Sequence, residues 1–453
     1  MTMISNLLRF SRRQLHTIVS REIIKPSSPT PSHLKTYNLS LLDQINAGTY
    51  MPMITFYPNT GIYHNSHDKT LSLKNSLSQT LTKYYPFAGR HARMGASYVD
   101  CNDNGAEFLE ASIDTTLSDF LQNSQHKDLD QFFPHGLVNF ESNRGEDDLQ
   151  SDDQVTPLEV QVNHFECGGV AVAASLSHKV ADGSSFAHFI NDWAKMTRFC
   201  SKEQKDDVSI SDPQFIHFPY MKVNNTRYSL QRSDDCIITK SFMFPNSKIN
   251  ELKLKVKAMT AESGQPIKNP TRVEVLTWLL YNCAVTVASK NNPGSFKPTS
   301  VAQLANLRGK MIEKLPEKSI GNFFVPLEIL TKKESEMNPE SFINELKKQK
   351  MQFEALPNIE TLFGILSDGD VDEQLRKGDD AYIFTSMCGY PAYEIDFGWG
   401  KPIKATFGGD LRKNTFVMMD APNKDGIEVL VCLGKDDMAI FQSDPELLAF
   451  GYF

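Results

Sequence analysis

The stretch Ser177-His178-Lys179-Val180-Ala181-Asp182-Gly183 places a histidine where a predicted strand stops and a predicted helix begins. The preceding residues, 170–176, are small and apolar and follow a Gly-Gly pair, which indicates a buried strand. The following residues repeat large apolar side chains at helical spacing, with Asp182 or Ser184 available as the helix cap. His178 is therefore expected at a rigid strand end. An imidazole held there is suited to general-base chemistry, because its ordinary pKa lies near neutrality.

The spacing His-x-x-x-Asp alone is a weak signal, since it occurs at His64/Asp68, His126/Asp130, His178/Asp182 and His188/Asp192. The first two pairs lie in polar stretches that are typical of loops or surface helices. The last pair falls one helical turn apart, which indicates a surface pair or a half-buried hydrogen bond. As metal ligands these two side chains would need a third, and none is evident, so we predict no metal site. The strand-end context and the adjacent Gly183 distinguish His178.

Composition limits the classes of function that are open to the chain. Its 453 residues predict two domains, and its net charge of −8 argues against a dedicated nucleic-acid binder. No run of eighteen apolar residues is present, so no membrane span is expected. The seven cysteines are scattered without a C-x-x-C pair, which favours free thiols in a reducing compartment. The start of the chain is cationic and free of acids up to Glu22, which is typical of either a disordered extension or a transit peptide.

Strand and helix patterns alternate through both halves of the chain, which predicts a mixed α/β protein. We expect an N-terminal extension over 1–16, a first domain over 17–200 that carries His178, a linker over 201–230 and a second domain over 231–453. The segment 98–110 is predicted to be a hairpin around Asn102-Asp103-Asn104-Gly105. Segment 393–396 is predicted to be a strand.

Several common catalytic motifs are absent from the sequence. It contains no G-x-S-x-G elbow, no H-E-x-x-H, no Walker loop and no G-x-G-x-x-G after a strand. A histidine without a recognisable Ser or Cys nucleophile suits direct attack by a substrate hydroxyl or amine on an activated acyl group, with no covalent enzyme intermediate.

SHKVADG together with DFGWGKP (396–402) resembles the plant BAHD acyltransferase family, and the resemblance extends from about residue 17 to nearly the end of the chain. Further segments fall in the family's order: KPSSPTP, LSLLDQ, YYPFAGR, VDCNDNGAEF, FECGG, PTRVEVLT, NLR, SIGNFF and FTSMCGYPAYEIDFGWGKP. The pattern is most similar to the branch that contains vinorine synthase. The resemblance implies two chloramphenicol-acetyltransferase-like domains of mixed sheet and helices with an active-site channel between them.

The resemblance also implies roles for individual residues. His178 would take the proton from the acceptor hydroxyl as its oxygen attacks an acyl-CoA thioester. Asp182 would be structural and pair with Arg308, supporting the loop that presents His178 and Gly183.

Two interpretations are open for the glycine-rich segment around Asp396, Gly398, Trp399 and Gly400: a nucleotide-binding loop or an architectural turn. We favour the turn, with Phe397 and Trp399 packing the second domain.

Coenzyme A contacts are expected near the end of the predicted strand 381–386. Thr385 and Ser386 resemble residues that face pantetheine, whereas Met387, Cys388 and Gly389 replace the family's usual Trp-Cys-Arg. Thr271 is a further CoA candidate, although a helix cap explains it equally well. Asn306 is the candidate for stabilising the oxyanion.

We therefore expect an O-acyltransferase that uses acetyl-CoA or another short acyl-CoA on a hydroxyl of a plant specialised metabolite, such as an alkaloid, a terpenoid or a sugar ester. The alternatives are acyl transfer to an amine and an acyltransferase-like protein that binds ligand without catalysis. No permanently bound cofactor is expected. We expect a cytoplasmic monomer, with an organelle address as the alternative.

Overall fold

The computed structural model describes most of the chain in eleven segments: 16–46, 49–61, 66–93, 95–134, 154–201, 212–220, 236–262, 267–291, 296–368, 381–409 and 411–453. Residues 1–15 of the predicted N-terminal extension and most of the predicted linker lie outside the described residues, whereas His16 begins the first strand.

The first of two large sheets has six strands in the order β1-β6-β8-β9-β3-β16. Only β6 and β8 run parallel, and all other neighbours are antiparallel. Two long helices cover one face of this sheet and bury Leu73, Leu77 and Leu81 of the first against Phe189 and Trp193 of the second. The elements are β1 (His16–Ile24), β3 (Tyr50–Tyr57), β6 (Ala106–Ile113), β8 (Leu158–Phe165), β9 (Val170–Ser177), β16 (Lys404–Phe407), α2 (Ser66–Lys83) and α4 (Gly183–Ser201).

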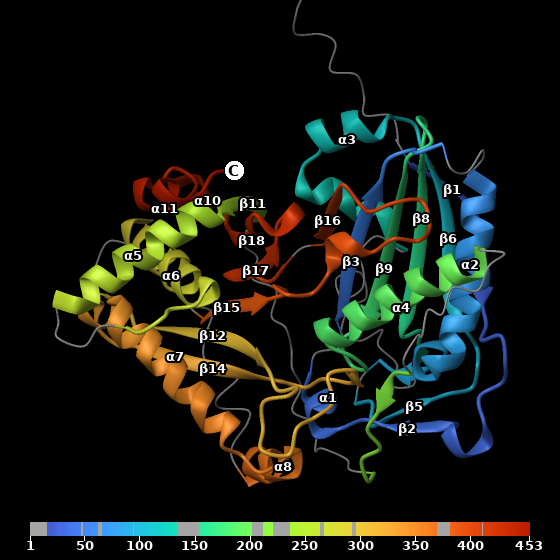
Figure 1. Cartoon of the computed structure of the whole chain (residues 1–453), viewed down its shortest axis with the longest axis horizontal. Coiled ribbons are helices and arrows are strands. Elements are labelled where there is room, and N and C mark those ends of the chain that lie inside the picture. The colour runs from blue at the N-terminus through green and yellow to red at the C-terminus, as the bar shows by residue number, and fades with distance from the viewer. Residues whose placement is uncertain are drawn as a thin grey trace, which may run out of the picture.

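The second sheet also has six strands, in the order β11-β18-β17-β15-β12-β14, with β12, β15 and β17 parallel to one another. Helices pack one of its faces around a separate apolar core, and Figure 1 shows them on the side away from the first sheet. The elements are β11 (Ile237–Pro245), β12 (Thr299–Asn306), β14 (Phe324–Thr331), β15 (Ala381–Ser386), β17 (Thr415–Asp420), β18 (Gly426–Gly434), α5 (Asn246–Glu262), α6 (Arg272–Asn291), α7 (Pro339–Glu354), α10 (Lys435–Phe441) and α11 (Pro445–Phe450). The prediction of two mixed α/β domains is thus confirmed.

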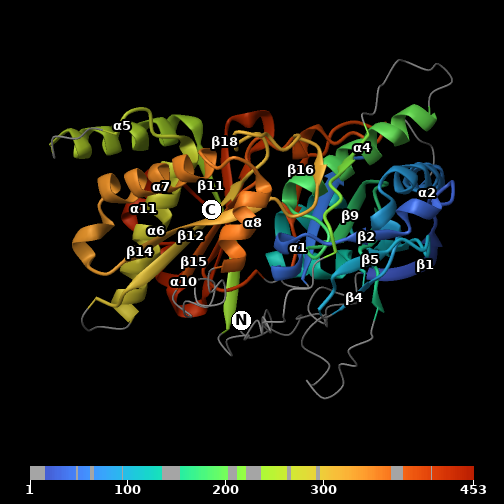
Figure 2. The same cartoon turned by 90° about the horizontal axis from the view of Figure 1, so that it is seen from below.

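Smaller elements connect the two parts, which Figure 2 shows side by side. A further core joins Leu41 and Leu42 of α1 (Leu41–Ile45) to Phe323 and to Leu362 and Phe363 of α8 (Ile359–Asp368). The other face of the first sheet packs α3 (Leu117–Asn123). Three short strand pairs complete the structure: β2 (Thr36–Asn38) with β5 (Tyr98–Asp100), β4 (His91–Ala92) with β7 (Gln154–Val155), and β10 (Gln214–Phe215) with β13 (Ser319–Ile320).

The segment after β15 returns to the first sheet, which the sequence analysis did not expect. β16 pairs with β3, with Phe407 opposite Met53. Phe397 and Trp399 are buried in the first core, where Tyr57 contacts both rings edge-on. The prediction that these two side chains pack the second domain is therefore wrong, because the chain crosses between the sheets just before them.

Two predicted elements are also wrong. Residues 98–110 form no hairpin, since β5 pairs with β2 while β6 pairs with β1 and β8. The turn between β5 and β6 is fixed by hydrogen bonds to other segments. The Asp103 carboxylate accepts hydrogen bonds from Thr30 and Lys35, and the Gly105 N–H donates to the Ala88 carbonyl. Segment 393–396 is no strand, because a 3-10 turn over Ala392–Glu394 follows Pro391.

Candidate functional site

His178 follows the last residue of β9, at the edge between the two sheets. Its backbone N–H donates to the Thr49 carbonyl at 2.8 Å, which fixes the strand end against the residue before β3. The turn 178–182 then leads into α4, which starts at Gly183. As a residue, His178 is partly exposed, unlike its buried neighbours Ser177 and Lys179. The predicted strand-end position of His178 is confirmed.

The side chain of Asn322 fixes the orientation of the His178 ring. Its amide nitrogen donates to the His178 carbonyl and to an Asp43 carboxylate oxygen, each at 2.8 Å. With the NH₂ group used in this way, the amide oxygen faces the ring and lies 2.9 Å from Nδ1. A carbonyl oxygen can only accept, so Nδ1 must carry a proton, and in the neutral ring Nε2 then presents its lone pair. Within the described part of the chain, no hydrogen bond to Nε2 is found.

Asp43 holds Asn322 from the other side. One carboxylate oxygen accepts from both the backbone and the side-chain nitrogen of Asn322, at 2.7 and 2.8 Å. The other oxygen accepts from the backbone N–H and the hydroxyl of Ser40, as part of the capping box that starts α1. Burial raises the pKa of Asp43, and the hydrogen bonds from Asn322 and Ser40 oppose that shift. The Asn322 amide is thus anchored to the N-terminus of a helix.

The surroundings of His178 favour its neutral form. Burial lowers the pKa of His178, and the negative charge of Asp182 opposes this only in part. The Phe324 ring lies edge-on at 5.7 Å between centroids and gives one side of the imidazole an apolar neighbour. An imidazole that is neutral at pH 7, with Nε2 unprotonated, can accept a proton from a substrate.

Asp182 is the last residue of the turn that begins at His178, and its carboxylate faces Arg308 rather than the imidazole. Arg308 donates to both carboxylate oxygens, at 2.7 and 3.0 Å, and both side chains are buried. The carboxylate also accepts from the backbone N–H groups of Ser185 and Phe323. Burial raises the pKa of Asp182, but the Arg308 charge and these hydrogen bonds outweigh it, so the pKa lies below its ordinary value. The pair links the start of α4 to the second domain.

Gly183 allows a close approach between the two halves of the chain. A Cβ atom at this position would lie 2.7 Å from Sδ of Met387, well inside van der Waals contact. The turn after β15 therefore packs directly onto the first residue of α4.

The DFGWG residues form a turn of their own. One Asp396 carboxylate oxygen accepts from the N–H groups of Gly398 and Gly400, at 2.7 and 3.0 Å. Both glycines have φ above +100°, which side-chain-bearing residues rarely adopt. Trp399 is buried in the first core, and no hydrogen bond between these described residues and His178 is found.

The CoA candidates fall in different places. Thr385 and Ser386 end β15 and are partly exposed, directly before Met387. Thr271 caps α6: its hydroxyl accepts from the Glu274 N–H, and the Glu274 carboxylate accepts from the Thr271 N–H. The cap is therefore present, and a contact from Thr271 to CoA stays a prediction.

Asn306 has a structural use that the sequence analysis did not foresee. Its amide oxygen accepts from the backbone and side chain of Arg308, and its nitrogen donates to the Tyr390 hydroxyl at 3.0 Å. These bonds hold Arg308 in place, so the geometry gives no support to Asn306 as an oxyanion donor.

The other His-x-x-x-Asp pairs serve different purposes. His188 Nε2 pairs with the Glu317 carbonyl, and Asp192 accepts from the Tyr84 hydroxyl and from Lys318, so the two do not bond to each other. No group of three or more candidate metal ligands occurs among the described residues. His64 lies outside them.

No helix of the described segments is long and apolar enough to cross a membrane.

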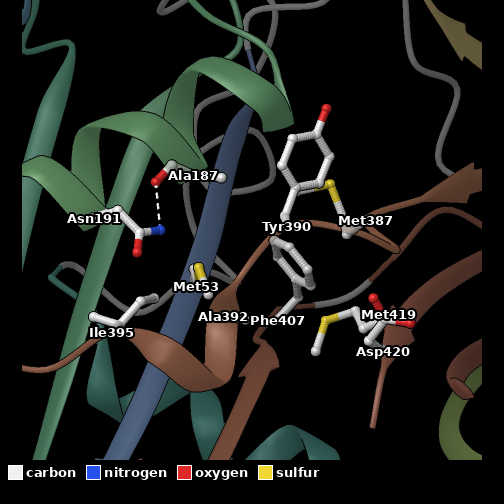
Figure 3. Close-up of a pocket in the computed structure, with 10 residues that line it drawn as sticks. All are labelled: Met53, Ala187, Asn191, Met387, Tyr390, Ala392, Ile395, Phe407, Met419 and Asp420. Carbon is white, nitrogen blue, oxygen red and sulfur yellow. Dashed lines mark hydrogen bonds between the residues drawn. The ribbon is translucent and has the colours of Figure 1, made fainter. Parts of the chain in front are cut away.

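A pocket opens between the two sheets, beside α4 (Figure 3). Its wall includes Met53 of β3, Ala187 and Asn191 of α4, and Met387 and Tyr390 from the turn after β15. It is lined mainly by apolar side chains.

Sequence reasoning missed Asn322 and Asp43 as parts of the site, although both lie in segments that carried the family resemblance. The bonded residues are 144 and 279 positions apart in the chain, so no local spacing could connect them.

Known proteins resemble this chain along nearly its whole length. The family model described as "Transferase family" matches residues 16–448. The chain is 38% identical, over 96% of its length and 90% of the relative, to 17,18-epoxy-17-hydroxycur-19-ene N-malonyltransferase of Strychnos nux-vomica. It is 37% identical, over 95% of its length and 97% of the relative, to deacetylvindoline O-acetyltransferase of Catharanthus roseus. The crystal structure of vinorine synthase superposes with a TM-score of 0.79 at 31% identity, covering 96% of this chain and 98% of that one. The chain therefore belongs to the transferase family of BAHD acyltransferases and is an acyltransferase.

Proposed function

We propose that the protein transfers a short acyl group from a coenzyme A thioester to a hydroxyl of a plant specialised metabolite, with His178 as the general base. The single observation that carries this proposal is the Asn322–His178 hydrogen bond, which leaves Nε2 unprotonated in the neutral ring. The similarity to relatives named for alkaloid acylation supports an alkaloid-like acceptor, with terpenoids and sugar esters as the other expected classes.

The proposed reaction needs one proton carrier. Nε2 takes the proton from the acceptor hydroxyl while the acceptor oxygen forms a bond to the thioester carbon. The resulting tetrahedral oxyanion collapses and breaks the carbon–sulfur bond, and the CoA thiolate leaves. The imidazolium then returns its proton to the thiolate. No covalent acyl-enzyme forms, and the acyl-CoA is a co-substrate that leaves as CoA.

The remaining predicted residues support this reaction from a distance. The Asp182–Arg308 pair and Gly183 would hold the turn that presents His178. Thr385 and Ser386 are proposed contacts of the pantetheine arm, because they end β15 next to the turn that packs on Gly183. The DFGWG turn is proposed to be architectural. The expectations of a monomer and of the cytoplasm stay predictions.

The proposal is tested with the purified full-length chain and a panel of acyl-CoAs crossed with hydroxylated metabolites, followed by mass spectrometry. An acylated alcohol that appears only with protein and acyl-CoA together supports the proposal. No acylated product with any pair would contradict it, and calorimetry with CoA would then test the binding-only alternative.

Transfer to an amine is the second candidate, because one relative is named as an N-malonyltransferase. The same base could serve an amine, since Nε2 accepts a proton from either nucleophile. Acceptors matched in shape that differ only in a hydroxyl or an amine would separate the two. A faster reaction with the amine would favour N-acylation.

A further inference from the structure

Lys179 is a buried cation directly after the proposed base. The residue is only 6% exposed, and a lysine is seldom buried to this extent unless its ammonium is bonded. Its Nζ donates to the Gln44 carbonyl at 2.8 Å. That carbonyl belongs to the last turn of α1, where helix carbonyls have no partner within the helix. A charged side chain from the His178 turn therefore closes the C-terminal end of α1.

The same short helix orients the His178 ring. The Asp43 carboxylate of α1 holds the Asn322 amide, whose oxygen accepts the proton of Nδ1. Gln44, the next residue of α1, is held by Lys179. Helix α1 is thus tied to the His178 turn at two consecutive residues, once through Asn322 and once through Lys179. A shift of α1 relative to the imidazole would break at least one of these ties.

The charge of Lys179 also acts on the imidazole. Burial lowers the pKa of Lys179 to about 8, and the negative charge of Asp43 opposes that shift, so the amine carries its proton at pH 7 and below. This positive charge adds to burial in lowering the pKa of His178, whereas Asp182 acts in the opposite direction. His91 of β4 also interacts with Lys179, but burial lowers the pKa of His91 to about 4, so this ring is neutral near pH 7. The Lys179 ammonium therefore favours a neutral His178.

We infer that Lys179 is a positioning residue for the general base, because its ammonium holds α1 against the His178 turn and disfavours protonation of the imidazole. The inference rests on the proposed function, since it concerns the same base. The hydrogen bond and the charge can be removed separately. Lys179→Met removes both, Lys179→Gln keeps a donor without the charge, and Lys179→Arg keeps a donor and the charge.

The test measures kcat at the pH optimum, and kcat/KM against pH, for the purified full-length chain with one acyl-CoA and one acceptor that the wild type turns over. Lys179→Met should lower kcat about 10- to 100-fold, as expected for a residue that orients a reacting histidine, and should move the acid limb to higher pH. Lys179→Gln should move the limb equally with a smaller loss of kcat, and Lys179→Arg should leave the limb in place.

Lys69→Met is the matched control. Lys69 of α2 is also buried, at 3% exposure, and its Nζ donates to a backbone carbonyl, that of Gly168, at 3.4 Å. Burial lowers the pKa of Lys69 as well. Because Lys69 has no hydrogen bond to α1 or to the His178 turn in the described part of the chain, its replacement should leave the acid limb where it is in the wild type.

Each other outcome has a defined meaning. An acid limb that stays in place in Lys179→Met and Lys179→Gln would overturn the inference, because any loss of kcat would then reflect packing alone. A limb that moves as far in Lys179→Arg as in Lys179→Met would also overturn it, since the charge would not be the cause. Circular dichroism shows whether Lys179→Met folds; where it does not, Lys179→Gln decides the question in the same way. These results would leave the proposed function standing, whereas wild-type protein that transfers no acyl group from any donor would defeat the proposed function itself.

Discussion

Two histidines near opposite ends of the same β8–β9 hairpin show how the partner of an imidazole decides its use. His164, on β8, has Nε2 between the Thr70 hydroxyl at 3.0 Å and the Glu110 carboxylate at 3.3 Å. His178, after β9, has Nδ1 bonded to the neutral amide of Asn322 and Nε2 left for a ligand. A carboxylate that engages Nε2 occupies the nitrogen that a substrate would need, whereas an amide on Nδ1 leaves Nε2 available as a base.

The largest expected difference between the two sites is catalytic. His178→Ala should lower the rate of acyl transfer by about 10²- to 10⁴-fold, the usual contribution of a general base. His164→Gln, the matched control in the same hairpin, should change the rate by less than about threefold, since no proton transfer of the reaction depends on it. Rates and circular dichroism spectra of both purified variants check this prediction. Comparable losses in the two variants would contradict it.

The next effect concerns stability. Asp182→Asn leaves the buried Arg308 guanidinium without its counter-charge, so the free energy of unfolding should fall by about 3–5 kcal/mol. Urea denaturation measures this loss. Glu345→Gln removes an exposed ion pair with Lys348 and should cost less than about 1 kcal/mol. Equal losses in the two variants would show that the Asp182 pair is not specially stabilising.

A smaller effect is expected from the residue that orients the base. Asn322→Ala removes the acceptor of the Nδ1 proton, so Nε2 is no longer the favoured unprotonated nitrogen. By analogy with residues that orient metal-bound histidines, kcat should fall about 10- to 100-fold. The KM values should stay nearly unchanged, because the amide faces the ring and not the substrate. A loss confined to KM would contradict the assigned role.

The smallest expected effect is on acid stability at the His164 site. The hydrogen bond to His164 is the main cause that lowers the pKa of Glu110 to about 2. Because an unfolded glutamate titrates near 4.3, this carboxylate stabilises the fold above that pH and loses its contribution as the pH falls toward 2. In Glu110→Gln, the urea concentration at the unfolding midpoint should therefore fall less steeply as the pH drops from about 5 to about 2. An unchanged decline would show that Glu110 contributes nothing.

The sequence predicted what local pattern encodes, and it failed where distant segments meet. The small, apolar run 170–176 and the helical spacing after Gly183 predicted β9, α4 and the place of His178. The pairing of β16 with β3 was missed, because a four-residue strand carries little pattern and its partner lies more than 300 residues away. The wrong hairpin at 98–110 came from turn residues that are real but direct the chain to other strands.

The candidate site was predicted in the same uneven way. Its base could be chosen from four similar pairs by its strand-end context. The sequence could not predict that Asn322 and Asp43 belong to the site. Only the folded chain brings helix α1, the turn after β9 and the start of β14 together. The pocket was equally invisible, because its wall is shared by both sheets.

The pH dependence of kcat/KM tests the central claim most directly, namely that a neutral imidazole accepts the substrate proton. Burial lowers the pKa of His178, so the acid limb should lie below the ordinary histidine value of about 6.5, with full activity at pH 7. The limb should be missing from any residual activity of His178→Ala. An acid limb above pH 7, or the same limb in that variant, would assign the proton transfer to another group.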